Sequence, residues 1–279
     1  MTEPQAIRAD FARLVKRPEP ALDLARGALL VAAEAEPALD VEAHVRQLDA
    51  WGRELGGRLE PDWNNLQRLA RLRAFLFDDL GFRGDHRDYY DPRNSLLHEV
   101  MTRRLGIPLT LSILFMELGW RVGIPFEGVG FPGHFLVRLT GEPEELLLDP
   151  FRRGMRVTRE ECRRMLSEMS GGKVPLGDDH LAATSKRDML ARMLLNLKGA
   201  YLRAQQDEPA LAAVDRLLLI HPEDIDEVRD RGLLLYRLTR YREALRALET
   251  YLAARADAPD RERIAIHLAD LRVLLAQMN

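Results

Sequence analysis

Cysteine is nearly absent from this sequence, since Cys162 is the only one among 279 residues. A single thiol cannot form an internal disulfide, which favours a reducing compartment. A long apolar run is also missing: the longest early one, Ala28 to Ala33, is far shorter than the roughly 20 residues that cross a bilayer. The first turns carry Glu3, Arg8 and Asp10 rather than an apolar core, so no secretory signal is expected. We therefore expect a soluble, cytoplasmic protein with no membrane partner.

An excess of one charge is absent as well. The chain has 41 basic and 44 acidic residues, which gives a net charge of −3. This near balance offers no electrostatic reason for nucleic acid to be a partner. Hydrophobic residues make up 46% of the sequence. That fraction, together with the length, predicts two compact units, each with its own core.

Residues 1–83 are predicted to form the N-terminal helical part of a first domain. Asp40 is expected to cap a helix that starts at Val41. A second helix is expected from Asn65 to Leu80, with Gly81 as its stop. The leucines of its packing stripe are Leu66, Leu69, Leu72, Leu76 and Leu80.

Residues 84–180 have a different pattern of apolar residues and are predicted to form the core of that domain. A helix from Ser95 to Leu105 is expected to stop at Gly106, and Pro108 then opens an apolar helix from Leu109 to Val122. Because that helix is apolar on most sides, it should be buried. Three strand-like segments and a further helix follow, at 126–130, 134–139, 145–148 and 158–169. Helices packed on a small antiparallel sheet predict an α+β, mainly helical fold.

Five short motifs in this middle region occur in a fixed order. They are Asn94–Val100, Arg104–Pro108, Gly123–Pro125, Gly130–Phe135 and Leu148–Phe151. On these motifs the chain resembles the SirB-type group of bacterial transglutaminase-like proteins, over roughly residues 90 to 155. The resemblance implies a transglutaminase-like, papain-like core.

The resemblance also implies where a catalytic triad would lie. In active relatives a Cys at the start of a buried helix, a His on one strand and an Asp on the next form the triad. His134 and Asp149 match the His and the Asp of that pattern. The Cys would fall near Pro108 to Thr110, where no thiol stands, and Cys162 lies on a later predicted helix. We therefore predict a pseudoenzyme, a non-catalytic interaction or regulatory protein that keeps a binding cleft.

Hydroxyl side chains near the missing thiol keep an enzymatic alternative open. A hydrolase or acyltransferase would use Thr110, Ser112 or Ser95 as nucleophile, together with His134 and Asp149. The structural alternatives are that Thr110 caps the helix and that Ser112 bonds back to a helix carbonyl. The catalytic candidates are His134, Asp149 and Thr110, and the cleft candidates are Asn94, Ser95, His98 and Ser112.

Three motifs that suggest a cofactor or a metal are rejected. Gly128–Gly133 fits the dinucleotide pattern by letter, but Pro132 interrupts the loop, and a strand-like run follows it instead of a helix. His98-Glu99 lacks the second His of a zinc-protease helix, because position 102 is Thr. The acidic stretch 85–91 is predicted to be a polar loop before a helix. No cofactor and no metal are therefore expected.

Residues 187–279 are predicted to be all-helical, with repeats of the tetratricopeptide (TPR) type. Similar residues recur 34 positions apart, as in Ala210 with Ala244, Val214 with Leu248, and Leu217 with Tyr251. Lys198 stands where the repeat usually has Gly, and a capping helix is expected from Arg261 to Met278. Such repeats typically bind a protein or peptide partner in a groove. With only two repeats, they could instead only cap the first domain, and both interpretations stay open. The glycine-rich stretch 171–179 is a predicted linker, and the oligomeric state is left open.

Overall fold

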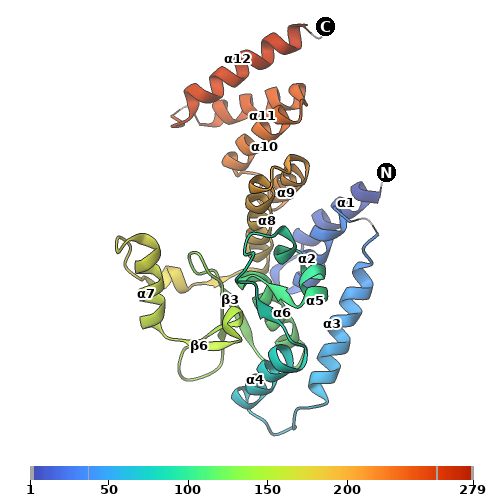
Figure 1. Ribbon diagram of the computed structural model, residues 1–279, viewed down its shortest axis with the longest axis vertical. Helices are drawn as coiled ribbons and strands as arrows, with labels where there is room; N and C mark the ends of the chain where they lie inside the picture. Colours follow the sequence, from blue (N-terminus) through green and yellow to red (C-terminus); the bar gives the residue numbers. More distant parts are fainter. Residues whose placement is uncertain (1–2, 37, 256, 278–279) are drawn as a thin grey trace. The chain divides into compact units, whose positions relative to one another are not determined.

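The computed structural model describes residues 3–36, 38–255 and 257–277 (Figure 1). Contacts between residues group the chain into two compact units, one that ends at Met193 and one that begins at Leu194. Helix α8 (Lys186–Arg203) runs through this point and through residue 187, so the predicted division at 187 stays a prediction. Within the described residues, no helix is long and apolar enough to cross a membrane.

Three helices open the first unit: α1 (Glu3–Val15), α2 (Leu24–Ala33) and α3 (Val41–Gly56). Helix α2 is almost entirely buried, which explains its apolar composition. The predicted cap of α3 is confirmed, because the Asp40 carboxylate accepts a hydrogen bond of 2.8 Å from the Ala43 amide. Helices α1 and α2 lie in the part predicted to be helical, although the sequence pattern gave no bounds for them.

Helix α4 (Asn65–Ala74) continues into a π-helical turn at Phe75–Asp79. Its predicted stripe is correct at Leu69, Leu72 and Leu76, which are buried, while Leu80 is half-buried. The prediction is wrong at Leu66, which is 48% exposed. Leu66 lies in the first turn, and burial begins only with the second. Gly81 ends the segment with a φ of +75°, a conformation that glycine adopts without steric cost.

Helix α5 (Leu97–Arg103) is shorter than predicted, because a 3-10 turn at Pro92–Ser95 precedes it. Its stop was also predicted wrongly. The left-handed residue is Arg104, with φ +62°, and not Gly106. Gly106 belongs to strand β2 (Leu105–Gly106), which pairs in parallel with β1 (Arg83–Gly84), so the chain leaves the helix earlier.

Helix α6 (Pro108–Arg121) is the buried helix that the sequence predicts, with every residue from Pro108 to Gly119 out of solvent. It lies beside a five-stranded sheet of order β6-β5-β4-β3-β7 (Figure 1). All neighbouring strands in this sheet are antiparallel, which confirms the α+β class. The strands are β3 (Phe126–Val129), β4 (Leu136–Leu139), β5 (Leu146–Asp149), β6 (Met155–Val157) and β7 (Ala183–Thr184).

Strands β6 and β7 were missed because two or three residues are too short to show an alternating pattern. Helix α7 (Arg159–Ser170) begins at the capping residue Thr158. Its buried face carries Cys162 and Leu166, which pack in one apolar cluster with side chains of the sheet and its loops. Cys162 is therefore a core residue.

Within its described residues, the second unit contains the end of α8 and four further helices. These are α9 (Asp207–Ile220), α10 (Ile225–Arg237), α11 (Tyr241–Ala254) and α12 (Arg261–Gln277). The predicted repeat is confirmed, since the paired positions Ala210 and Ala244 are both fully buried, as are Val214 and Leu248. The predicted end of the last helix, Met278, lies outside the described residues.

Lys198, the departure from the repeat pattern, forms a partly buried ion cluster inside the second unit. Its ammonium donates to Glu227 Oε1, and to Asp230 Oδ2 at 3.0 Å. Burial raises the pKa of Glu227, and the hydrogen bond from Lys198 acts against that rise. A glycine at position 198 would leave the Glu227 carboxylate without this partner.

Candidate functional site

His134 and Asp149 lie next to each other at one end of the β4–β5 hairpin. Asp149 is the last residue of β5, and His134 stands two residues before β4. The antiparallel register pairs Val137 with Leu148, so the two side chains reach the same end of the hairpin. The Nε2 atom of His134 is 2.9 Å from Asp149 Oδ2.

The carboxylate of Asp149 is fully buried and has four hydrogen-bond donors. Its Oδ2 accepts from His134 and, at 2.7 Å, from Arg152 Nε. Its Oδ1 accepts from the amides of Phe151 and Arg152, at 3.0 and 3.2 Å. Burial alone would raise the pKa of the Asp149 carboxyl, but the hydrogen bonds and charges of His134 and Arg152 hold it below its usual range. Asp149 is therefore ionised at neutral pH and fixes the orientation of the His134 ring.

The other ring nitrogen of His134, Nδ1, has no hydrogen bond to any described residue. The side chain keeps 14% of its surface exposed. Four aromatic side chains, which we call the aromatic rim, continue outward from it: Phe151, His86, Tyr89 and Tyr90. The ring of Phe151 stands edge-on to His134 at 6.1 Å. Tyr89 and Tyr90 are 39% and 57% exposed, so the rim ends in solvent.

Arg192 holds the turn that carries His134. Its Nη2 donates to the carbonyls of Phe131 and His134, at 2.9 and 2.6 Å. Its guanidinium also lies over the ring of Phe135, 5.5 Å from the centroid. Sequence reasoning missed Arg192, Arg152 and the aromatic rim, because neither a local pattern nor a motif links them to residues 134 and 149.

The predicted nucleophile position, near Pro108 to Thr110, lies at the start of α6. The Thr110 hydroxyl is fully buried. It donates to the carbonyl of Asn94 at 2.8 Å and accepts from the amide of Ile107 at 3.1 Å. Both bonds are structural, since they close the start of α6 and tie it to the preceding turn.

Ser112 and Cys162 are the other candidates near or after this helix. The Ser112 hydroxyl is buried and has no partner among the described residues, so the predicted bond back to a helix carbonyl is wrong. Burial raises the pKa of the Cys162 thiol, and nearby carboxylates reinforce the effect. The only thiol of the chain is therefore inaccessible to a substrate, and its raised pKa disfavours the thiolate.

The remaining cleft candidates have structural contacts of their own. Asn94 is fully buried and donates to Asp85 Oδ2 at 3.1 Å and to the carbonyl of Asp88 at 2.7 Å, which closes the acidic loop. Ser95 is 4% exposed and belongs to the same turn.

His98 lies on α5 and bonds to a different carboxylate, with its Nε2 3.2 Å from Glu36 Oε2. Potential ligand atoms of Glu36, His98 and Glu99 lie within 4.8 Å of one another, and these residues would be the ones to test for a metal. The absence of a metal stays a prediction.

Comparison with known proteins gives two family matches. Residues 42–195 match the transglutaminase-like superfamily, and residues 197–269 match the tetratricopeptide repeat. A UPF0162 protein from Xylella fastidiosa (strain Temecula1) is 35% identical over 255 residues, which cover 90% of both chains. One from Pseudomonas aeruginosa is 31% identical over 248 residues, 89% of this chain and 90% of the relative. Human F-box only protein 21 is 34% identical over 183 residues, 62% of this chain but 28% of its own length.

Proposed function

This chain belongs to the transglutaminase-like superfamily, in its SirB-type group with C-terminal tetratricopeptide repeats, and from that premise we propose that it is a non-catalytic protein-interaction module. The observation that carries the proposal is the bonding of Thr110. Its hydroxyl stands at the nucleophile position but is fully buried and engaged by Asn94 and Ile107. To attack a substrate, this hydroxyl would have to break the hydrogen bonds that cap a buried helix.

The paired His134 and Asp149 then have a positioning role. Together with Arg152 they hold the end of the β4–β5 hairpin, and the aromatic rim stands beside them. Exposed tyrosines next to a rigid ionic pair suit the binding of a peptide, because tyrosine offers a large contact area with little loss of conformational entropy. The helical repeats of the second unit are the further binding surface, since TPR-type helix pairs bind partner segments. A regulatory role in the cytoplasm is part of this proposal.

The alternative is a hydrolase or acyltransferase that uses a Ser or Thr hydroxyl. One observation favours it: His134 is oriented by an ionised carboxylate, while its Nδ1 is free to accept a proton. In that case Thr110, Ser112 or Ser95 would have to reach Nδ1 in a rearranged state.

The test measures hydrolysis and amine transfer on pooled peptide and ester substrates. We compare the native chain with His134→Ala, and with His221→Ala as a control at a histidine of the second unit. We expect the same background rate in all three proteins, because the Thr110 hydroxyl is buried and engaged in structural hydrogen bonds. Turnover that disappears only in His134→Ala would overturn the non-catalytic proposal, and loss in Thr110→Val as well would identify the nucleophile.

A further inference from the structure

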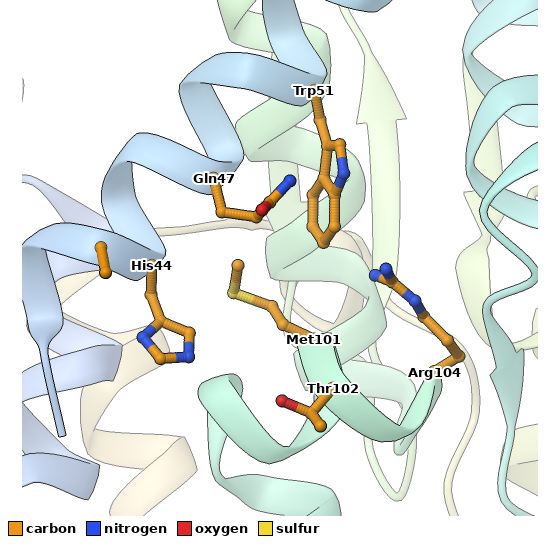
Figure 2. A pocket seen from close by; sticks show the side chains of 7 residues that line it. His44, Gln47, Trp51, Met101, Thr102 and Arg104 are labelled. Carbon is orange, nitrogen blue, oxygen red and sulfur yellow. The ribbon is translucent and has the colours of Figure 1, made fainter.

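A cavity of about 350 Å³ opens between helices α3 and α5, within the first unit. Its lining residues are Ala43, His44, Gln47, Trp51, Met101, Thr102 and Arg104. Figure 2 shows the Arg104 guanidinium directed toward the Trp51 indole, with the Met101 thioether and the Gln47 amide turned into the same space. The cavity therefore combines a cation, an amide and apolar walls, which is the usual composition of a small-molecule site.

Arg104 is the distinctive member of this set. The rings of Trp51 and Phe82 cover its guanidinium, with centroids 4.6 and 4.7 Å from Cζ. These two rings are nearly perpendicular to each other, at 84°, so at most one of them lies flat on the guanidinium plane. Its backbone has a φ of +62°, which is uncommon for a residue other than glycine. The chain therefore keeps a strained arginine at a point where glycine would fit better.

The charge of Arg104 is not neutralised within the described residues. No carboxylate forms an ion pair with it, and its buried Nη1 has no hydrogen-bond partner there. Burial lowers the pKa of Arg104, and no carboxylate opposes that effect. An anion beside the guanidinium would compensate for the lost hydration.

We propose that this cavity binds a small organic monocarboxylate, with Arg104 as the group that holds the carboxylate. The fork of N–H donors matches the two carboxylate oxygens, and the Gln47 amide offers a further donor on the same wall. Thr102 adds no donor, because its hydroxyl already donates to the carbonyl of His98 at 2.9 Å.

The number of charges selects a monocarboxylate over a phosphate. Arg104 is the one permanently charged residue among those that line the cavity, so it balances one negative charge and not two. The indole of Trp51, the thioether of Met101 and the methyl group of Ala43 provide apolar contacts for the body of the ligand. A compact aromatic or branched acid fits this combination.

The test is calorimetric titration of the full chain with phenylacetate, with phenylacetamide as the neutral analogue of the same shape. We expect phenylacetate to bind and phenylacetamide to bind about tenfold or more weakly, because the amide lacks the charge that pairs with Arg104. Arg104→Gln should weaken phenylacetate binding by a similar factor. Arg46→Gln, on the exposed face of α3, is the control and should leave the affinity unchanged.

A second variant keeps the test decisive if Arg104→Gln does not fold. Ala43→Leu would fill the cavity from α3 without touching the guanidinium, and it should abolish binding with an unchanged melting temperature. Equal affinity for the acid and the amide, or no binding of phenylacetate, would overturn the proposal. Inorganic phosphate that displaces phenylacetate at similar concentration would also overturn it, since the site would then be a general anion site.

Discussion

At the scale of single residues, the buried carboxylate of Asp149 should matter for stability as well as for the site. In Asp149→Asn the charge-assisted hydrogen bonds from His134 and Arg152 are lost, while the two backbone amides keep an acceptor. Arg152 is 40% exposed, so solvent screens part of its contribution. We expect the free energy of unfolding at pH 7 to fall by about 2 kcal/mol, measured by urea denaturation.

The same substitution gives a prediction for pH. A carboxyl whose folded pKa lies below its unfolded value contributes stability above the unfolded pKa, about 3.9, and loses it as the pH falls through the folded pKa. The difference between the native chain and Asp149→Asn should therefore be present above about pH 4 and shrink below it. Asp62→Asn, at an exposed loop residue, is the control. A difference of constant size down to pH 3 would contradict this account.

At the scale of secondary-structure elements, the contact between α6 and β3 depends on the absence of a side chain at Gly119. A Cβ atom there would lie 2.3 Å from the Phe126 ring, which is itself buried. We expect Gly119→Ala to lower the free energy of unfolding by about 1–3 kcal/mol, since the core must shift to admit a methyl group. Gly56→Ala in α3 is the matched control, because its nearest neighbour would be 3.9 Å away. A neutral or stabilising effect at Gly119 would contradict the close packing of α6 on β3.

The elements also show which parts of the fold a sequence can predict. The apolar helix α6 and the strands β3 to β5 follow from local pattern: α6 is a long apolar run between Pro108 and Gly123, and the strands are short apolar segments separated by turn residues. Strands β6 and β7 have no such pattern, because pairing with the existing sheet edges defines them. The end of α5 was mispredicted for a similar reason. Gly106 pairs with Gly84 in a strand, so the helix ends two residues earlier, at the left-handed residue Arg104.

For the candidate site, the pair at 134 and 149 was suggested by the motifs of the family resemblance. The sequence did not suggest Arg152, whose side chain returns to the Asp149 carboxylate, or Arg192, which bonds the turn from a helix 58 residues later in the chain. Charged residues are common in this chain, and only the fold decides which of them meet. The Arg104 cavity was missed for the same reason, since α3 and α5 supply its lining from distant parts of the sequence.

At the scale of the whole molecule, each compact unit has a buried core of its own, so we expect two unfolding transitions in scanning calorimetry. Gly119→Ala acts in the first unit, and Gly232→Ala acts in the second, where a Cβ atom would lie 2.6 Å from Leu248. Each substitution adds one methyl group to a packed helix contact and should lower one melting temperature only. For each kcal/mol of lost stability, the melting temperature should fall by about 4–8 °C in the second unit and by about 2–4 °C in the first. The second unit is smaller, so its unfolding entropy is smaller. If both variants move one shared transition, the two units unfold together, and the continuous helix α8 would then be the element that couples them.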